Sequence, residues 1–139
     1  MKNPFSLFII ICSMMLISCK RDNGVMCTQE YRMLTISIKD AASNPVILSQ
    51  YFVKKTSTDE VIDFSQEDHY LDSINRLNGI YFVLTDSKIG MTLKNGTEFE
   101  FHGLLGTTEI VNEKYIIGND ECHVIMLSGK TQIILGAGL

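Results

Sequence analysis

Short runs in which apolar and polar residues alternate make up most of the chain after position 30. In one run Leu34, Ile36 and Ile38 share a face, and in another Phe99 and Phe101 share a face. Successive side chains of a β-strand point to opposite faces, so each run predicts a strand with one buried side. The apolar members of these runs are therefore expected to form the core.

Turn-forming residues separate the runs, including Pro45, Asn78-Gly79 and Asn95-Gly96. Proline cannot donate to a strand ladder, and Asn-Gly favours tight turns. Seven or eight strands spaced by about 8–12 residues are typical of an antiparallel β-sandwich, here of prealbumin-like or immunoglobulin-like topology. The segment 46–55 is expected to be the second strand, with Ile47, Tyr51 and Val53 on one face and Leu48, Gln50 and Lys54 on the other. The irregular segment 65–78 is expected to hold one helical turn or to cross between sheets.

The N-terminal segment combines Lys2 with an apolar run over residues 5–16, followed by Ile17-Ser18-Cys19. The run is too short for a membrane-spanning helix, which needs about 20 residues, and is typical of a signal peptide. A small residue directly before a cysteine resembles the lipobox of bacterial lipoproteins. The resemblance implies that residues 1–18 are removed and that Cys19 carries diacylglycerol and a further acyl chain such as palmitate. Residues 19–29 would then form the tether, and residues 30–139 the sandwich domain.

A second resemblance covers residues 31–85. An apolar strand ending in Asp40, the turn Asn44-Pro45 and the strand residues Tyr51-Phe52-Val53 resemble the opening of carboxypeptidase regulatory-like domains. Asn78-Gly79-Ile80-Tyr81 is similar to the later Asp-Gly-x-Tyr step of that family, with Asn in place of Asp. The resemblance implies a seven-stranded prealbumin-like sandwich, usually non-catalytic, and together with the lipobox an envelope lipoprotein of a Bacteroidota-type bacterium.

The charge balance limits the partners. The chain holds 12 Lys and Arg against 16 Asp and Glu, a formal net charge of −4, without a basic patch. Nucleic acid is therefore not expected as a partner. Attachment to a membrane would depend on the acyl chains rather than on attraction to anionic lipids.

Two cysteines are expected to remain in the domain. Cys12 leaves with the signal peptide and Cys19 carries the lipid, so Cys27 and Cys122 form an even pair in an oxidising compartment. A disulfide is the leading interpretation. Two buried free thiols or a pair of metal ligands are the alternatives.

Candidate chemistry is sparse. Glu67, Asp68, His69 and Asp72 form the densest group of metal-ligand residue types, with Asp68, His69 and Asp72 as weak candidates, but the EF-hand spacing is absent. A solvated polar loop is the leading interpretation, and no cofactor is expected.

A hydrolytic triad would need His69, His102 or His123, yet no sequence motif marks a nucleophile. His102 is expected on a surface face, and His123 is expected to be structural or exposed.

Two short motifs have ordinary explanations beside functional ones. Gly129-Lys130-Thr131 matches the end of a phosphate-binding loop but lacks its earlier glycine, so a hairpin turn is expected. Asp72-Ser73-Ile74 resembles the pattern on which Bacteroidota attach O-glycans, which makes Ser73 a candidate acceptor.

These observations predict a non-catalytic, lipid-anchored binding or assembly module of the cell envelope, in the outer rather than the inner membrane. Segments 65–78 and 86–96 are expected to form the contact surface, with another envelope protein or a glycan as partner. The alternatives are a subunit of a surface fibre, or a small envelope enzyme or inhibitor.

Overall fold

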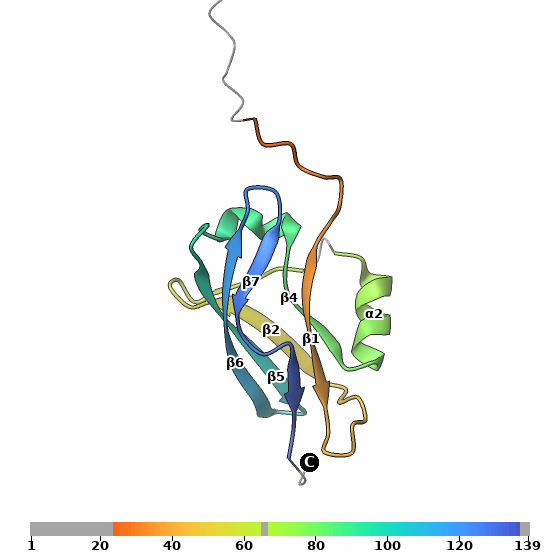
Figure 1. Ribbon diagram of the computed structural model, residues 1–139. Helices are drawn as coiled ribbons and strands as arrows, with labels where there is room; N and C mark the ends of the chain where they lie inside the picture. The colour runs from red at the N-terminus through yellow and green to blue at the C-terminus, as the bar shows by residue number, and fades with distance from the viewer. Residues whose placement is uncertain (1–23, 65–66, 137–139) are drawn as a thin grey trace, which may run out of the picture.

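The computed structural model describes residues 24–64 and 67–136. Cys19 and the expected signal peptide lie outside the described residues. Within these residues, eight strands, one α-helix and one 3-10 helix follow one another (Figure 1). Their bounds are β1 Met33–Lys39, β2 Gln50–Lys55, β3 Glu60–Val61, α2 His69–Leu77, β4 Ile80–Thr85, η2 Asp86–Met91, β5 Thr97–Leu105, β6 Thr108–Asn119, β7 Val124–Ser128 and β8 Gln132–Ile134.

The strands form two sheets that pack face to face, which confirms the all-β sandwich. One sheet has the order β4-β1-β8 and the other β3-β2-β5-β6-β7. Every pair is antiparallel except β1 and β8, which run parallel. The expected hairpin at Gly129 is wrong, because the chain crosses there from β7 in one sheet to β8 in the other.

The core lies between the sheets and follows the alternation of the sequence. Ile36 and Ile38 of β1 face Phe99 and Phe101 of β5, and all four side chains are buried. Buried aliphatic and aromatic side chains of this kind each contribute about 1.5–3 kcal/mol to folding. The prediction of which face of these two strands is buried is therefore confirmed.

The second strand begins later than expected. Residues 46–49 precede β2, and Ile47 is 52% exposed whereas Leu48 is 2% exposed, the reverse of the predicted alternation. The reason is Tyr81, whose hydroxyl accepts a hydrogen bond from Leu48 N and donates one to Val46 O, both at 2.7 Å. These backbone groups are thus satisfied without a strand partner.

A two-and-a-half-turn helix takes the place of the expected single turn. Asp68 caps α2 by accepting hydrogen bonds from Tyr70 N and Leu71 N. Such a cap typically contributes about 1 kcal/mol. The helix ends at Asn78, and Gly79 follows with φ +67°, where an added Cβ would lie 2.6 Å from Ile38 O. Figure 1 shows α2 beside β4, and residues 81–85 are buried on both faces of that strand.

Candidate functional site

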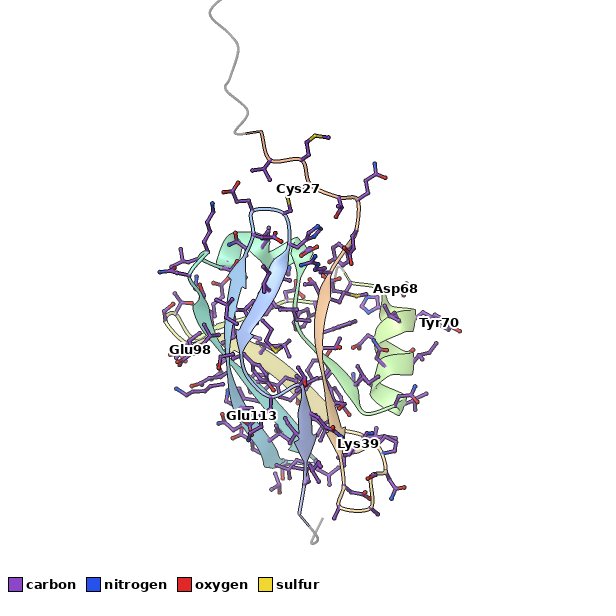
Figure 2. All side chains as sticks on the ribbon, viewed as in Figure 1. Cys27, Lys39, Asp68, Tyr70, Glu98 and Glu113 are labelled. Atoms are coloured by element: carbon purple, nitrogen blue, oxygen red, sulfur yellow. A yellow bond between two sulfur atoms is a disulfide. The ribbon has the colours of Figure 1, made fainter. Side chains whose placement is uncertain are left out.

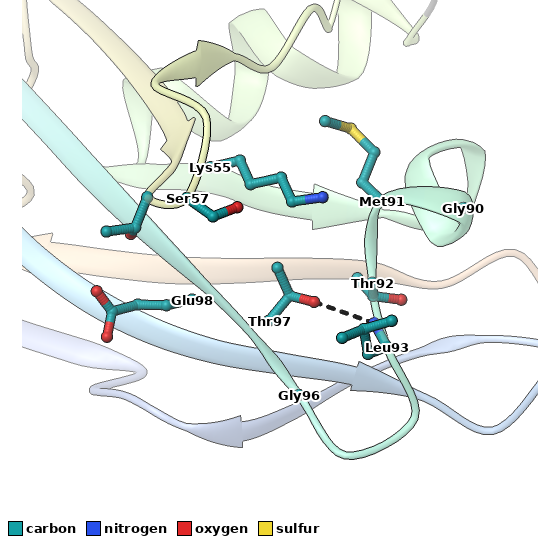
Figure 3. Close-up of a pocket in the computed structure, with 10 residues that line it drawn as sticks. Lys55, Ser57, Gly90, Met91, Thr92, Leu93, Gly96, Thr97 and Glu98 are labelled. Atoms are coloured by element: carbon teal, nitrogen blue, oxygen red, sulfur yellow. Dashed lines mark hydrogen bonds between the residues drawn. The ribbon is translucent and has the colours of Figure 1, made fainter.

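A pocket of about 430 Å³ opens at one end of the sandwich, between the β2–β3 turn and the segment that joins β4 to β5 (Figure 3). Its volume falls within the range of about 300–1,000 Å³ that is usual for small-molecule sites. One wall consists of residues 55–57 and the other of residues 90–93, with residues 96–98 as the floor. The second wall belongs to the segment 86–96 that the sequence marked as a contact loop.

The alternation of two strands places polar side chains in this pocket. Tyr51 and Val53 point into the core, so Lys55 is the next residue on the same face of β2. Thr97 likewise extends the inward row of Phe99 and Phe101 on β5. The core ends at this point, and both side chains consequently face the hollow between the layers rather than packed apolar groups.

Lys55 is the central charged group of the pocket. Its side chain is half-buried and extends across the opening toward Met91 (Figure 3). The part of the chain that the structure describes offers Lys55 no ion-pair partner. Its neighbour Lys54 lies on the opposite face of the strand, with its ammonium 5.8 Å from the centre of the Phe52 ring. Lys55, an unpaired cation on a half-buried side chain, is the residue in this pocket most suited to hold an anion.

Hydroxyl groups surround this ammonium. Thr97 Oγ1 accepts a hydrogen bond from Leu93 N at 3.0 Å, which leaves its own proton free to be donated. Ser57 lies next to Lys55 in Figure 3. The pocket therefore contains more hydrogen-bond donors than acceptors.

The one carboxylate of the lining faces elsewhere. Glu98 forms an ion pair with Lys114 at 3.0 Å on the outer face of the sheet and points away from Lys55 in Figure 3. Lys114 holds the pKa of Glu98 below its ordinary value. Glu98 is thus a charged neighbour of the pocket and not a partner of Lys55.

The wall opposite Lys55 is apolar and fixed in place. Met91 and Leu93 line it, and Leu93 is 64% exposed. Between them Thr92 accepts hydrogen bonds from Asn119 Nδ2 at its carbonyl and at its hydroxyl oxygen. Gly96 closes the segment with φ +108°, where an added Cβ would lie 2.5 Å from Ile116. The predicted Asn95-Gly96 turn is confirmed.

A second cluster ties the N-terminal segment to the sandwich. Cys27 and Cys122 form a disulfide with their Cα atoms 5.3 Å apart, which confirms the pairing proposed from the sequence. Figure 2 shows Cys27 at the end of the sandwich where β6 turns into β7. The predicted pair therefore closes the tether onto that turn.

Beside the disulfide, Thr28, His123 and Asp86 form a hydrogen-bonded chain. Asp86 Oδ2 lies 2.7 Å from His123 Nδ1, and His123 Nε2 lies 3.0 Å from Thr28 Oγ1. A carboxylate only accepts, so Nδ1 donates its proton to Asp86, and Nε2 faces the Thr28 hydroxyl. The order of groups is that of a hydrolytic triad.

The surroundings of these three hydrogen-bonded residues favour a structural role, however. His123 is 5% exposed, and Asp86 also accepts hydrogen bonds from Arg32 N and Val124 N. We call this cluster (Cys27, Thr28, Asp86, Cys122 and His123) the tether latch. Of the two roles expected for His123, structural or exposed, the structure shows a buried side chain, which agrees with the structural role.

A buried carboxylate lies close to the latch. Glu67 is 9% exposed and accepts hydrogen bonds from the hydroxyls of Tyr31, Thr85 and Ser87. Burial by itself raises the pKa of Glu67, but the three hydroxyl donors outweigh it and bring the pKa below the ordinary value of 4.5. Glu67 therefore stabilises the fold in its ionised form.

We expect Glu67 to make the domain acid-sensitive. A carboxylate whose pKa is lower in the folded state contributes stability above its unfolded pKa and loses it as the pH falls through the folded pKa. Urea unfolding at pH 7, 5 and 3 should show Glu67→Gln to be less stable than wild type by about 1–3 kcal/mol at pH 7. The difference should shrink toward pH 3; a difference that stays constant across this range would contradict the assignment.

The candidate metal ligands have other partners. Asp68 caps α2, and Asp72 accepts a hydrogen bond from the Tyr51 hydroxyl at 2.9 Å and lies 3.9 Å from Arg76. His69 is exposed at the first turn of the helix. Within residues 24–64 and 67–136 no group of three or more His, Cys, Asp or Glu side chains is placed to hold a metal ion. Ser73 is exposed on α2, and its glycosylation remains a prediction.

His102 points outward from β5, as predicted, but it is not exposed. The Phe52 ring stacks on it with the centroids 4.7 Å apart, and Glu109 Oε2 lies 2.7 Å from His102 Nδ1. The side chain is consequently 7% exposed. The prediction of a surface histidine is wrong because a neighbouring strand supplies an aromatic cover.

The two expected contact segments do not form one surface. Figure 1 shows α2 on one side of the sandwich and η2 near the end from which the tether departs. α2 carries a separate exposed row of Tyr70, Ile74 and Leu77, and Tyr70 points away from the sandwich in Figure 2. Only the segment 86–96 lines the pocket that contains Lys55.

Fold and site together define a two-layered β-sandwich with a donor-rich pocket at one end and an N-terminal segment that a disulfide joins to the sandwich. No family model matches the chain, and comparison with curated proteins and with solved structures gives no significant match. Among the described helices none has the length and apolar character needed to cross a membrane.

Proposed function

We propose that this chain is a lipid-anchored, non-catalytic binding module of the cell envelope, whose pocket between residues 55–57 and 90–98 holds a small ligand. The observation that carries the proposal is the unpaired, half-buried Lys55 in a pocket of suitable volume. The lipobox around Cys19 supports the anchoring, and the resemblance to carboxypeptidase regulatory-like domains supports a binding role.

The position of the pocket suits such a module. Arg32, which follows the proposed tether of residues 19–29 and directly precedes β1, is joined to the start of η2 through two hydrogen bonds, Arg32 N to Asp86 Oδ2 and Asp86 N to Arg32 O. The helix η2 leads directly into the wall that contains Met91 and Leu93. The tether and one wall of the pocket are thus mechanically linked.

Two experiments test the two parts of this proposal. Metabolic labelling with an alkyne-bearing fatty acid in the native type of cell should mark the wild-type chain and not Cys19→Ala. A thermal-shift screen of small carboxylates, amines, alcohols and sugars should raise the unfolding temperature for at least one class, because ligands that bind only the folded state stabilise it. An unlabelled wild-type chain would contradict the anchor, and a screen without any shift would contradict the binding role.

One observation favours the fibre subunit as a second candidate. β7 pairs only with residues 116–119 of β6, so among the described strands none covers the outer edge of residues 108–115. An adjoining groove of about 500 Å³ is lined by Val111, Ile133 and Leu135, and the Lys130–Glu113 ion pair crosses it. Free strand edges accept extended segments of other chains, whereas inward-pointing charges such as Glu113 discourage this.

The fibre subunit makes a clear prediction of its own. Crosslinked cells should give a regular ladder of oligomers on a denaturing gel. A single monomeric band at native expression would count against this candidate and leave the binding module as the proposal.

A further inference from the structure

We infer that the pocket between residues 55–57 and 90–98 binds a monocarboxylate that carries a short hydrocarbon chain. This inference rests on the proposed binding function and specifies its ligand. It follows from three features of the pocket: a single unpaired cation, a surplus of hydrogen-bond donors, and an apolar wall opposite the cation.

The cation sets the charge of the ligand. Lys55 is the one basic residue of the lining, and its inward position on β2 removes it from the acidic residues on the outer face. Burial of an unpaired ammonium is costly unless an anion accompanies it, so a ligand that covers Lys55 should be anionic. A dianion such as a phosphate monoester would exceed this single charge, so a monoanion fits the pocket better.

The donors set the chemistry of the anion. The ammonium of Lys55 offers three N–H groups, and the hydroxyls of Thr97 and Ser57 each have a proton that no described residue accepts. A ligand in this position must accept several hydrogen bonds and need donate none. A carboxylate has two oxygens that only accept, whereas an alcohol also brings a donor of its own and an ammonium only donates.

The opposite wall sets the remainder of the ligand. Met91 and Leu93 present apolar surface to the hollow, and Leu93 is 64% exposed although the segment around it is fixed by Asn119. Burial of such surface by a hydrocarbon chain is favourable by roughly 25 cal/mol per Å². Methionine adapts its shape to different chains, which suits a class of ligands rather than one compound.

The chain itself offers a matched pair of variants. Lys55→Met removes the ammonium and retains an unbranched side chain in the pocket. Lys54→Met makes the same change one residue earlier, on the opposite face of β2, where Lys54 lies over Phe52. A third variant, Leu93→Asp, places a negative charge on the apolar wall at a side chain exposed enough to be changed without loss of folding.

Binding of octanoate to the full chain, followed by isothermal titration calorimetry, tests the inference. Octanoate should bind, and octanol and octylamine should bind at least tenfold more weakly, as expected when hydrogen bonds to a charged group are lost. Lys55→Met and Leu93→Asp should each weaken octanoate binding at least tenfold, and Lys54→Met should change it less than twofold. Circular dichroism of each variant confirms that the fold is retained.

Further arms separate the sources of such a carboxylate. An acetylated Leu-Leu dipeptide with a free carboxylate represents the C-terminus of a peptide, and octanoate represents a free fatty acid. The ligand that binds more tightly identifies the source of the carboxylate, provided that Lys55→Met weakens its binding.

Two outcomes would overturn the inference: octanol or octylamine binding as tightly as octanoate, or equal effects of Lys55→Met and Lys54→Met. Either can occur while another ligand class still shifts the unfolding temperature, so a failure of this inference is distinguishable from a failure of the binding function itself.

Discussion

Replacing both Cys27 and Cys122 by alanine should lower the free energy of unfolding of the full chain by up to about 4–5 kcal/mol. The bridge spans 95 positions, so its loss returns a large amount of conformational freedom to the unfolded chain. Urea unfolding at pH 7, monitored by circular dichroism, measures the change. Because a domain of this size has a total stability of about 5–15 kcal/mol, the variant should be only marginally folded at 37 °C.

Reduction provides the control for this prediction. Wild type unfolded in the presence of dithiothreitol should match the double variant without reductant, and dithiothreitol should leave the double variant unchanged. A loss of less than about 1 kcal/mol, well below the usual 2–5 kcal/mol, would mean that the bridge contributes little to stability.

Removal of the Asp86 carboxylate should have an effect of similar size. In Asp86→Ala three buried donors lose their acceptor: His123 Nδ1, Arg32 N and Val124 N. Leaving a buried donor unsatisfied costs about 1–3 kcal/mol, so a total loss of about 3–5 kcal/mol is expected. Thermal and urea unfolding of the variant, with its disulfide intact, measure this loss.

Two matched variants locate the cause. Asp86→Asn retains an oxygen that can accept from one or two of these donors and should lose less stability than Asp86→Ala. Asp120→Ala removes a neighbouring carboxylate that accepts from Cys122 N and His123 N at the β6–β7 turn. If Asp120→Ala destabilised the chain as much as Asp86→Ala, the turn rather than the buried carboxylate would be the main source of stability.

The contribution of Asp86 to stability should also depend on pH. Burial alone raises its pKa, but His123 and the two backbone donors outweigh burial and bring the pKa below the ordinary value of 3.8. Its contribution is therefore present at neutral pH and lost as the pH falls through the folded pKa.

The alternation of residues was sufficient to predict the sandwich and much of its core. Ile36, Ile38, Phe99 and Phe101 follow a strict period of two, and local backbone geometry then decides which face is buried. The Cys27–Cys122 pair was predictable for a different reason, since only two cysteines remain once Cys12 and Cys19 are assigned to the N-terminal segment.

The remaining features depend on contacts between distant segments. The late start of β2 results from the Tyr81 hydroxyl, which takes up the backbone groups of Val46 and Leu48. The cover over His102 comes from Phe52, fifty positions earlier in the sequence and opposite it in the ladder. Such contacts leave no trace in the local pattern of either residue.

The site was only partly visible in the sequence. Lys55 follows Tyr51 and Val53 on an inward row, and an unexpected charge at the end of such a row is a signal that was available. The hydrogen bonds that join Asp86, His123 and Thr28 could not be predicted, because these residues come from three separate parts of the sequence and none lies in a recognisable motif.

The disulfide also bears on how far the domain could stand from the proposed lipid anchor. If Cys19 is linked to lipid while Cys27 is held against the β6–β7 turn, eight positions separate the two cysteines, a reach of at most about 26–29 Å when fully extended. Opening the bridge and the hydrogen bonds beside it would release the chain as far as Met33, where β1 begins, and lengthen the reach to about 46–50 Å. Opening of the bridge together with these hydrogen bonds would thus let an anchored domain sample a zone nearly twice as deep as the layer that it can reach with both in place.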